Sequence, residues 1–190
     1  LDNMDGLAAG VSATAAAYFT VIAALNGQFM VSILAAAILG ACLGFLFYNS
    51  RPATVFMGDA GSLCLGILLA ALGIKLKFPD ASNVVTWMVP VMVLGVPVFD
   101  TTLVTVSRLR KGKNPLKTPG QDHLSHRLTA RGCTTLEAVL LHYLLGAGFG
   151  LLAIYLMQAG IAEGYQAGAT VLLLLIWLIW RLDRTFEPTA

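Results

Sequence analysis

The chain has 190 residues, of which 57% are apolar and only 12% are charged, and its mean hydropathy is +0.79. An average soluble domain is roughly 25% charged, so this chain has too few charges to cover a water-exposed surface. The composition excludes an ordinary soluble domain and predicts a polytopic membrane protein. The net charge is +2 and no basic stripe alternates with aromatic residues, which argues against nucleic acid as a partner.

Six apolar segments follow one another along the chain, and most approach the roughly 20 residues that a membrane-crossing helix needs. The third is short unless it extends to Phe78, and the fourth contains Pro90 and Pro97. We predict an all-α, polytopic transmembrane bundle of about six spans, with residues 1–190 forming a single domain. The predicted spans are Leu7–Leu25, Phe29–Tyr48, Ser62–Ile74, Val84–Val106, Leu136–Met157 and Ala167–Trp180.

The distribution of basic residues predicts how these spans are oriented. If the spans alternate, segments 1–6, 49–61, 107–135 and 181–190 lie on one side of the membrane. That side receives ten of the twelve Lys and Arg residues, and the other side receives only Lys75 and Lys77. Because short cytoplasmic loops are enriched in Lys and Arg, the first side is predicted to be cytoplasmic.

Three acidic residues close to the predicted cytoplasmic face are candidate ligands for a metal ion that also binds phosphates. Asp2 and Asp5 are three residues apart, so a helix would present both carboxylates on one face, either to Mg²⁺ or as acids that complement the helix dipole. Asp59 lies between Gly58 and Gly61 where the third span begins. It could bind a metal that bridges phosphates, or it could cap the helix.

Further candidates lie in the fourth span and in the loop that follows it. Asp100 is an ionisable residue within a span, which is costly unless it has a function or a partner such as Arg108. The loop carries His123, His126 and Arg127, which are residue types that act as bases and clamp phosphates. An ordinary positively charged loop would explain the arginine but not the paired histidines.

These motifs, in this order, resemble the polyprenyl-phosphate N-acetylhexosamine-1-phosphate transferase family, also called glycosyltransferase family 4. The resemblance covers residues 1 to about 132. It is carried by four segments: Leu-Asp-Asn-Met-Asp-Gly-Leu at 1–7; Tyr-Asn-Ser-Arg-Pro-Ala at 48–53 followed by Phe-Met-Gly-Asp-Ala-Gly-Ser at 56–62; Pro-Val-Phe-Asp at 97–100; and Asp-His-Leu-Ser-His-Arg-Leu at 122–128.

The resemblance implies a reaction in which a UDP-N-acetylhexosamine and polyprenyl phosphate give polyprenyl-diphosphate-sugar and UMP, in cell-envelope polysaccharide synthesis. The form of the last motif is more similar to the GlcNAc-type transferases than to the phospho-MurNAc-pentapeptide translocase. A cytoplasmic active site in the bacterial inner membrane is implied, and a homodimer is left open. Whether a carboxylate attacks first or the lipid phosphate attacks directly is also left open.

The resemblance also implies roles for individual residues. Asp59 would hold Mg²⁺, with Mn²⁺ as the alternative ion, while Asp2 and Asp5 would place the nucleotide or the metal. His123 and His126 would engage the diphosphate as catalytic residues. The residues implied in substrate binding and in ordering the site are Asn49, Asp100 and Arg127.

The chain departs from the family pattern at three points. Asn3 stands where the family usually has Gly, and Ser125 stands where it usually has His. An Asp-Asp motif that the family carries upstream is absent, so we expect this chain to be the C-terminal part of a longer enzyme and to be inactive alone. The alternative class is a secondary transporter with a broken span, although its polar groups would be expected near the membrane midplane.

Overall fold

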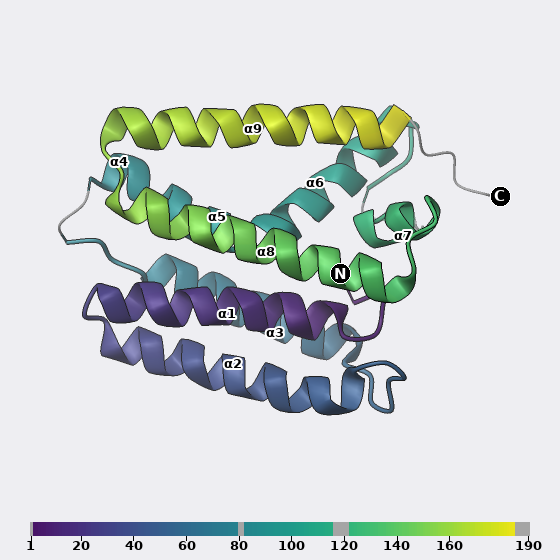
Figure 1. Ribbon diagram of the computed structural model, residues 1–190, viewed down its shortest axis with the longest axis horizontal. Coiled ribbons are helices and arrows are strands. Elements are labelled where there is room, and N and C mark those ends of the chain that lie inside the picture. The colour runs from purple at the N-terminus through teal and green to yellow at the C-terminus, as the bar shows by residue number, and fades with distance from the viewer. Residues whose placement is uncertain (1, 80–81, 116–121, 185–190) are drawn as a thin grey trace.

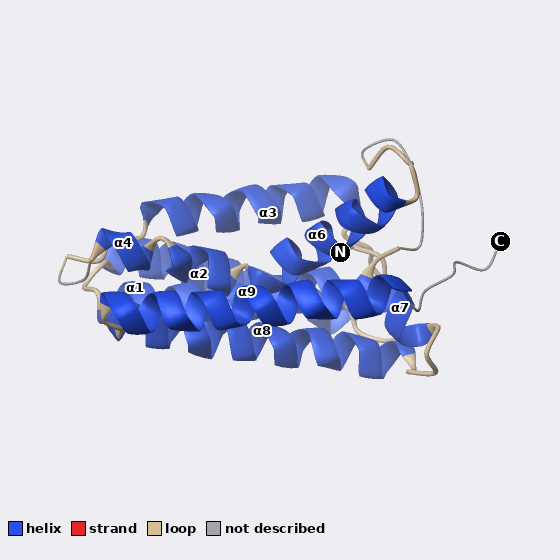
Figure 2. Ribbon diagram, turned by 90° about the horizontal axis from the view of Figure 1, so that it is seen from above, coloured by secondary structure: helices blue, strands red, loops and turns tan. Residues whose placement is uncertain are grey.

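The computed structural model describes residues 2–79, 82–115 and 122–184, and these residues form helices and loops without a strand (Figure 2). Leu1, Lys117 and the segment 185–190, which belong to the predicted motifs and basic loops, lie outside the described residues. The helices are α1 (Leu7–Leu25), α2 (Phe29–Asn49), α3 (Gly58–Lys75), α4 (Asn83–Thr86), α5 (Met88–Val93), α6 (Gly95–Arg110), α7 (Leu124–Thr129), α8 (Thr135–Gln158) and α9 (Ile161–Arg184).

Five of these helices are long and apolar enough to cross a membrane, namely α1, α2, α3, α8 and α9. A sixth span is made by the stretch Val84–Val93 together with Gly95–Arg110. The prediction of an all-α bundle with about six spans is therefore confirmed. The last span begins earlier than predicted, at Ile161, and Gly164 and Gly168 near its start lie against Val85 and Met88.

The fourth span is not a straight helix, because its two halves meet at an angle of 79°. The break falls at Leu94, between α5 and α6. Pro97 contributes to it, since proline has no N–H to donate to the carbonyl four residues earlier. Gly95 allows the ring of Phe149 to approach: a Cβ atom at this position would lie 2.6 Å from that ring. The bend redirects α6, which carries Asp100.

Helix α1 lies at the centre of the bundle and packs against α2, α3 and α8 (Figure 1). Its alanines and glycine permit this close packing, while Phe19 and Ile22 fill the space between helices and are fully buried. By contrast, α2 and α9 expose most of their apolar side chains. In a membrane those exposed faces contact lipid, so the low burial of α2 and α9 is compatible with stability.

The loops alternate between the two ends of the bundle, as the sequence predicts. The N-terminus, the connection from α2 to α3, and α7 lie at one end, on the right in Figure 1. The turn from α1 to α2, helix α4 and the connection from α8 to α9 lie at the other end. All the segments that carry the predicted site residues are thereby brought to one end of the molecule. That this end is cytoplasmic stays a prediction.

Replacing Gly150 by Ala should destabilise the bundle, because its new Cβ atom would lie 2.2 Å from the ring of Tyr18. That ring is held in place by a 2.9 Å hydrogen bond from the tyrosine hydroxyl to the carbonyl of Ala147. We expect a loss of about 1–3 kcal/mol from overpacking, measured by thermal unfolding of the detergent-solubilised full-length protein. Gly148→Ala on the same helix is the matched control, since a Cβ there meets nothing within 4 Å. Equal melting temperatures for the two variants would contradict this account.

Candidate active site

Gly6 holds the loop that carries the two N-terminal acids, residues 2–6, which we call the acid loop. Its φ angle of 77° lies in the left-handed region that glycine adopts without strain. Its N–H donates to Oδ1 of Asn49 at 3.0 Å, and its carbonyl accepts from the hydroxyl of Tyr143 at 2.6 Å. The acid loop is therefore fixed between the end of α2 and helix α8.

Asp2 and Asp5 lie outside the helix, which begins only at Leu7. The turn at Gly6 interrupts the helical path that would have placed both carboxylates on one helix face, and neither acid lies in the first turn of α1. The Asp5 carboxylate instead accepts a hydrogen bond from the N–H of Ala53 at 3.2 Å. The acid loop is thus bonded to the segment that leads to α3.

Asn49 connects three parts of this end of the bundle. It ends α2, is only 5% exposed, and receives the bond from Gly6, while its Nδ2 donates to the carbonyl of Val55 at 2.8 Å. Both functional groups of its amide are engaged by the backbone. These contacts order the acid loop and the connection from α2 to α3.

Asp59 occupies the first turn of α3 and is exposed. It is not the N-cap, which is Met57, so the capping alternative for Asp59 is wrong. Its backbone carbonyl accepts a 3.2 Å hydrogen bond from the hydroxyl of Ser62. Because the side chain of Asp59 is exposed, its carboxylate is accessible near the start of the helix, where backbone N–H groups favour an anion.

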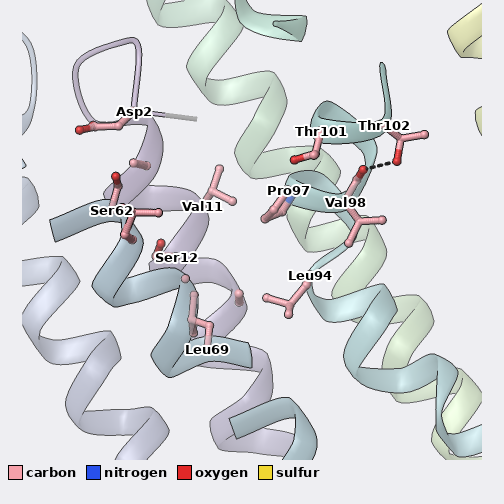
Figure 3. Close-up of a pocket in the computed structure, with 14 residues that line it drawn as sticks. Asp2, Val11, Ser12, Ser62, Leu69, Leu94, Pro97, Val98, Thr101 and Thr102 are labelled. Atoms are coloured by element: carbon pink, nitrogen blue, oxygen red, sulfur yellow. Dashed lines mark hydrogen bonds between the residues drawn. The ribbon is translucent and has the colours of Figure 1, made fainter. Parts of the chain in front are cut away.

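A cavity of about 550 Å³ runs between α1, α3 and the bent fourth span. Asp2 and Ser62 lie at one end of it, and Thr101 and Thr102 lie on the opposite wall (Figure 3). Most of its remaining lining is apolar: Ala8, Val11, Ala15, Leu63, Gly66, Leu69, Leu94, Pro97 and Val98, with Ser12 among them. The cavity therefore combines a polar mouth with an apolar interior.

Asp100 orients His123. Its Oδ2 lies 2.7 Å from Nδ1 of His123, and its Oδ1 accepts a hydrogen bond from the N–H of Leu124 at 2.7 Å. Because a carboxylate only accepts, Nδ1 carries the proton and Nε2 of the imidazole remains for another partner. Asp100 is 1% exposed, whereas the side chain of His123 is 28% exposed. Asp100 therefore pairs with His123 and not with Arg108, which was the structural alternative.

Residues 122–129, which we call the histidine loop, are anchored by buried ionic contacts. Asp122 accepts from Nε of Arg108 at 3.1 Å and lies 3.8 Å from the ammonium of Lys111. Arg127 is 0% exposed, and its guanidinium donates to the carbonyls of Asp122 at 2.8 Å and Leu182 at 3.0 Å. These contacts join α7 to α6 and to the end of α9.

Burial lowers the pKa of His126 below its ordinary value, and repulsion by protonated His123 acts in the same direction. Asp100 opposes this shift but is outweighed. His126 is therefore predominantly neutral at pH 7, with a ring nitrogen available to accept a proton or a hydrogen bond.

The acid loop and the histidine loop contact each other directly. Nδ2 of Asn3 donates to Oγ of Ser125 at 2.9 Å, and the serine hydroxyl lies 3.1 Å from Oδ1 of Asn3, to which it can donate. Together with the bonds of Asn49 and Asp5, this contact gathers three of the predicted motifs. The remaining motif, Pro-Val-Phe-Asp at 97–100, is joined to them by the contact between Asp100 and His123.

Within the part of the chain that the structure describes, no three His, Cys, Asp or Glu side chains are grouped as a metal site. A Mg²⁺ ion is usually held by one or two carboxylates together with substrate phosphates, so a site for it need not contain such a cluster. Asp59 is exposed in the first turn of α3, one turn before Ser62, which lines the cavity.

Comparison with known proteins supplies the family. Residues 1–77 match the model described as glycosyl transferase family 4. The chain is 38% identical over 161 residues to a probable undecaprenyl-phosphate N-acetylglucosaminyl 1-phosphate transferase of Bacillus subtilis, covering 85% of this chain and 44% of the relative. It is 38% identical over 158 residues to a phospho-N-acetylmuramoyl-pentapeptide-transferase of Halalkalibacterium halodurans, covering 82% and 45%. The chain belongs to glycosyl transferase family 4.

A third family member is similar over much of the chain. A decaprenyl-phosphate N-acetylglucosaminephosphotransferase of Mycolicibacterium smegmatis is 36% identical over 162 residues, which cover 76% of this chain and 40% of the relative. The chain thus spans less than half the length of the curated family members it matches. These relatives are transferases, and the comparisons give the transporter alternative no support.

Tyr143 is a site residue that sequence reasoning missed. It lies in α8, outside the motifs from which the site was predicted, yet its hydroxyl holds Gly6. Its ring also fills the space beside Gly10, where a Cβ atom would lie 2.0 Å from Cζ. The signal available in the sequence was weak, because a tyrosine in an apolar helix is usually a packing residue.

We expect Arg127→Met to destabilise the histidine loop, and any weakening of substrate binding to be a consequence of that loss of structure. The substitution removes a buried guanidinium that satisfies two backbone carbonyls and lies 3.9 Å from the carboxylate of Asp183. We expect the full-length protein to lose about 3 kcal/mol of stability, measured by thermal unfolding. Arg131→Met, at an exposed position four residues away, is the control and should change stability little. Unaltered stability with weakened substrate binding would instead support Arg127 as a substrate ligand.

The neutral state of His126 predicts how stability varies with pH. Because its pKa is lower in the folded protein than in the unfolded chain, the unfolded chain binds the proton more readily. The stability contribution of His126 is therefore complete above about pH 6.5, the ordinary histidine pKa, and is lost as the pH falls through the folded value. We expect His126→Gln to flatten the decline in melting temperature between pH 7.5 and 5.5. Parallel declines in the variant and the parent would contradict this.

Proposed function

We propose that the full-length protein transfers N-acetylhexosamine 1-phosphate from a UDP-sugar to polyprenyl phosphate and releases UMP. The observation that carries the proposal is that the acid loop, the start of α3 and the histidine loop meet at one end of the bundle. The acid loop and α3 border an apolar cavity there, and the histidine loop contacts the acid loop. The printed functions of the family members support the same reaction class. GlcNAc is the sugar we propose, and the pentapeptide-bearing sugar is the alternative within the family.

The proposed reaction is a phosphoryl transfer, in which catalysis depends mainly on positioning and charge stabilisation. A new oxygen–phosphorus bond forms between the lipid phosphate and the phosphorus that bears the sugar. The bond from that phosphorus to the bridging oxygen breaks, and this oxygen leaves with UMP. Atoms and charges therefore balance without a further reactant.

The polar mouth of the cavity suits the phosphates, and the apolar interior suits a prenyl chain. Asp2 and Ser62 border the mouth, while Leu69 and Leu94 line the wall farther along the cavity. A prenyl phosphate would place its head between α1 and α3 and its chain along the membrane-embedded part of the bundle. This arrangement supports a lipid-linked acceptor more than a solute carried across the membrane.

Asp59 is the residue that we propose holds Mg²⁺, with Mn²⁺ as the alternative ion. The bound ion would neutralise the diphosphate. Asp2 borders the cavity and would place the nucleotide or share the ion, while Asp5, bonded to Ala53, would keep the acid loop in position.

The two histidines are proposed to engage the diphosphate. Asp100 would act as a positioning residue, since both of its carboxylate oxygens are occupied and it holds His123 with Nε2 free of that contact. His126, predominantly neutral, would accept a proton from the lipid phosphate, the substrate group that can still carry one near pH 7. Asn49 and Arg127 would support the site through the backbone contacts described above.

The multi-pass character of the chain and its bacterial relatives support a location in the bacterial plasma membrane. We propose that the end of the bundle carrying the site faces the cytoplasm, where the UDP-sugar is available and where the basic loops are expected.

Asp59→Asn in the full-length protein should abolish UMP release from UDP-GlcNAc in the presence of undecaprenyl phosphate. Loss of the carboxylate removes the proposed Mg²⁺ ligand, so turnover should fall about 100-fold or more, as measured by chromatography of the released UMP. Glu163→Gln is the matched control, since Glu163 is an exposed acid at the opposite end of the bundle. A parallel assay with UDP-MurNAc-pentapeptide distinguishes the two sugar donors.

Turnover that persists in Asp59→Asn, or that resists EDTA in the unmodified protein, would overturn the metal assignment. Absence of UMP release from any UDP-sugar would overturn the proposed reaction itself.

A further inference from the structure

We propose that Asn3 and Ser125 form a positioning pair that sets how the acid loop sits against the histidine loop. The inference rests on the proposed function, because it assigns these residues to the alignment of that reaction's groups. Each member lies at the centre of a candidate motif: Asn3 between Asp2 and Asp5, and Ser125 between His123 and His126. A displacement of either member therefore moves candidate catalytic groups on both of its sides.

The contact between the two side chains is reciprocal. The asparagine amide donates to the serine oxygen at 2.9 Å, and the serine hydroxyl can donate to the asparagine oxygen at 3.1 Å. Two bonds between the same two side chains restrict rotation as well as separation. The pair joins segments that are 122 residues apart in the chain, so contacts within either loop could not hold the two loops together.

Burial strengthens the argument that the pair controls position. Ser125 is 0% exposed, and Asn3 is partly buried. Water cannot easily replace a partner for a hydroxyl in this environment, so loss of Asn3 would leave Ser125 unsatisfied. The loops would then have to shift to restore a hydrogen bond.

The two side chains also limit one another in size. Ser125 is fully buried beside Asn3, so an imidazole at position 125 would need space that the asparagine side chain occupies, and a glycine at position 3 would free that space.

The test is a double-mutant cycle in the full-length protein, with Asn3→Ala, Ser125→Ala and the double variant. We expect each single variant to lower kcat for UMP release about tenfold, because small misplacements of reacting groups are costly. The KM for the UDP-sugar should change less than about threefold. The double variant should also lose about tenfold and not a hundredfold, since one contact is removed in all three.

Two further measurements separate positioning from a general loss of structure. Ser32→Ala is the matched control, because it removes a serine hydroxyl that bonds the carbonyl of Thr20 at 3.0 Å and belongs to no candidate site. It should leave kcat unchanged. The exchange Asn3→Gly with Ser125→His should retain kcat within about threefold of the parent, while Ser125→His alone should lose about tenfold because the buried position cannot accept an imidazole beside Asn3.

Unchanged kcat in the single variants, or a hundredfold loss in the double variant, would overturn the positioning pair. Melting temperatures of the same cycle provide a readout that does not depend on activity, and strictly additive shifts would also overturn the pair. If the parent releases no UMP while the melting temperatures are coupled, the proposed reaction has failed and the contact between the loops has not.

Discussion

The arrangement of the site depends on how the backbone of Gly6 is held. One side chain from the end of α2 accepts from its N–H, and one from α8 donates to its carbonyl, so a single peptide region connects three helices. The left-handed φ angle at Gly6 ends the acid loop and allows α1 to begin at the next residue. Because α1 is the central helix, the packing of the bundle core also fixes where the acid loop lies.

Much of this fold could be predicted from composition and from the lengths of apolar segments. A helix in a membrane satisfies its own backbone hydrogen bonds, so an apolar run of sufficient length specifies an element with little help from tertiary contacts. The broken span was less predictable: Pro90 and Pro97 indicated an interruption, but the size and direction of the bend depend on Phe149 packing against Gly95. Contacts of that kind leave no local pattern.

The candidate site could be predicted as a set of residues but not as a geometry. The alternation of the predicted spans placed Asp59, His123 and the acid loop at one end of the bundle. Arg127 was interpreted as a phosphate ligand, because the sequence does not show that its side chain is buried. The structure surrounds it with backbone carbonyls. Asp100 is similar: its place in a span indicated an unusual carboxylate, and only the fold identified His123 as its partner.

The backbone contacts of Arg127 also constrain the order in which parts of the site can form. One of its acceptors, the carbonyl of Leu182, lies 55 residues later in the chain, near the end of the last described helix. During synthesis the acid loop and α1 emerge before the histidine loop, which follows after five further helices. The guanidinium then lacks that acceptor until α9 has entered the membrane. Within the part of the chain that the structure describes, the histidine loop therefore gains its full set of contacts only when α9 is in place.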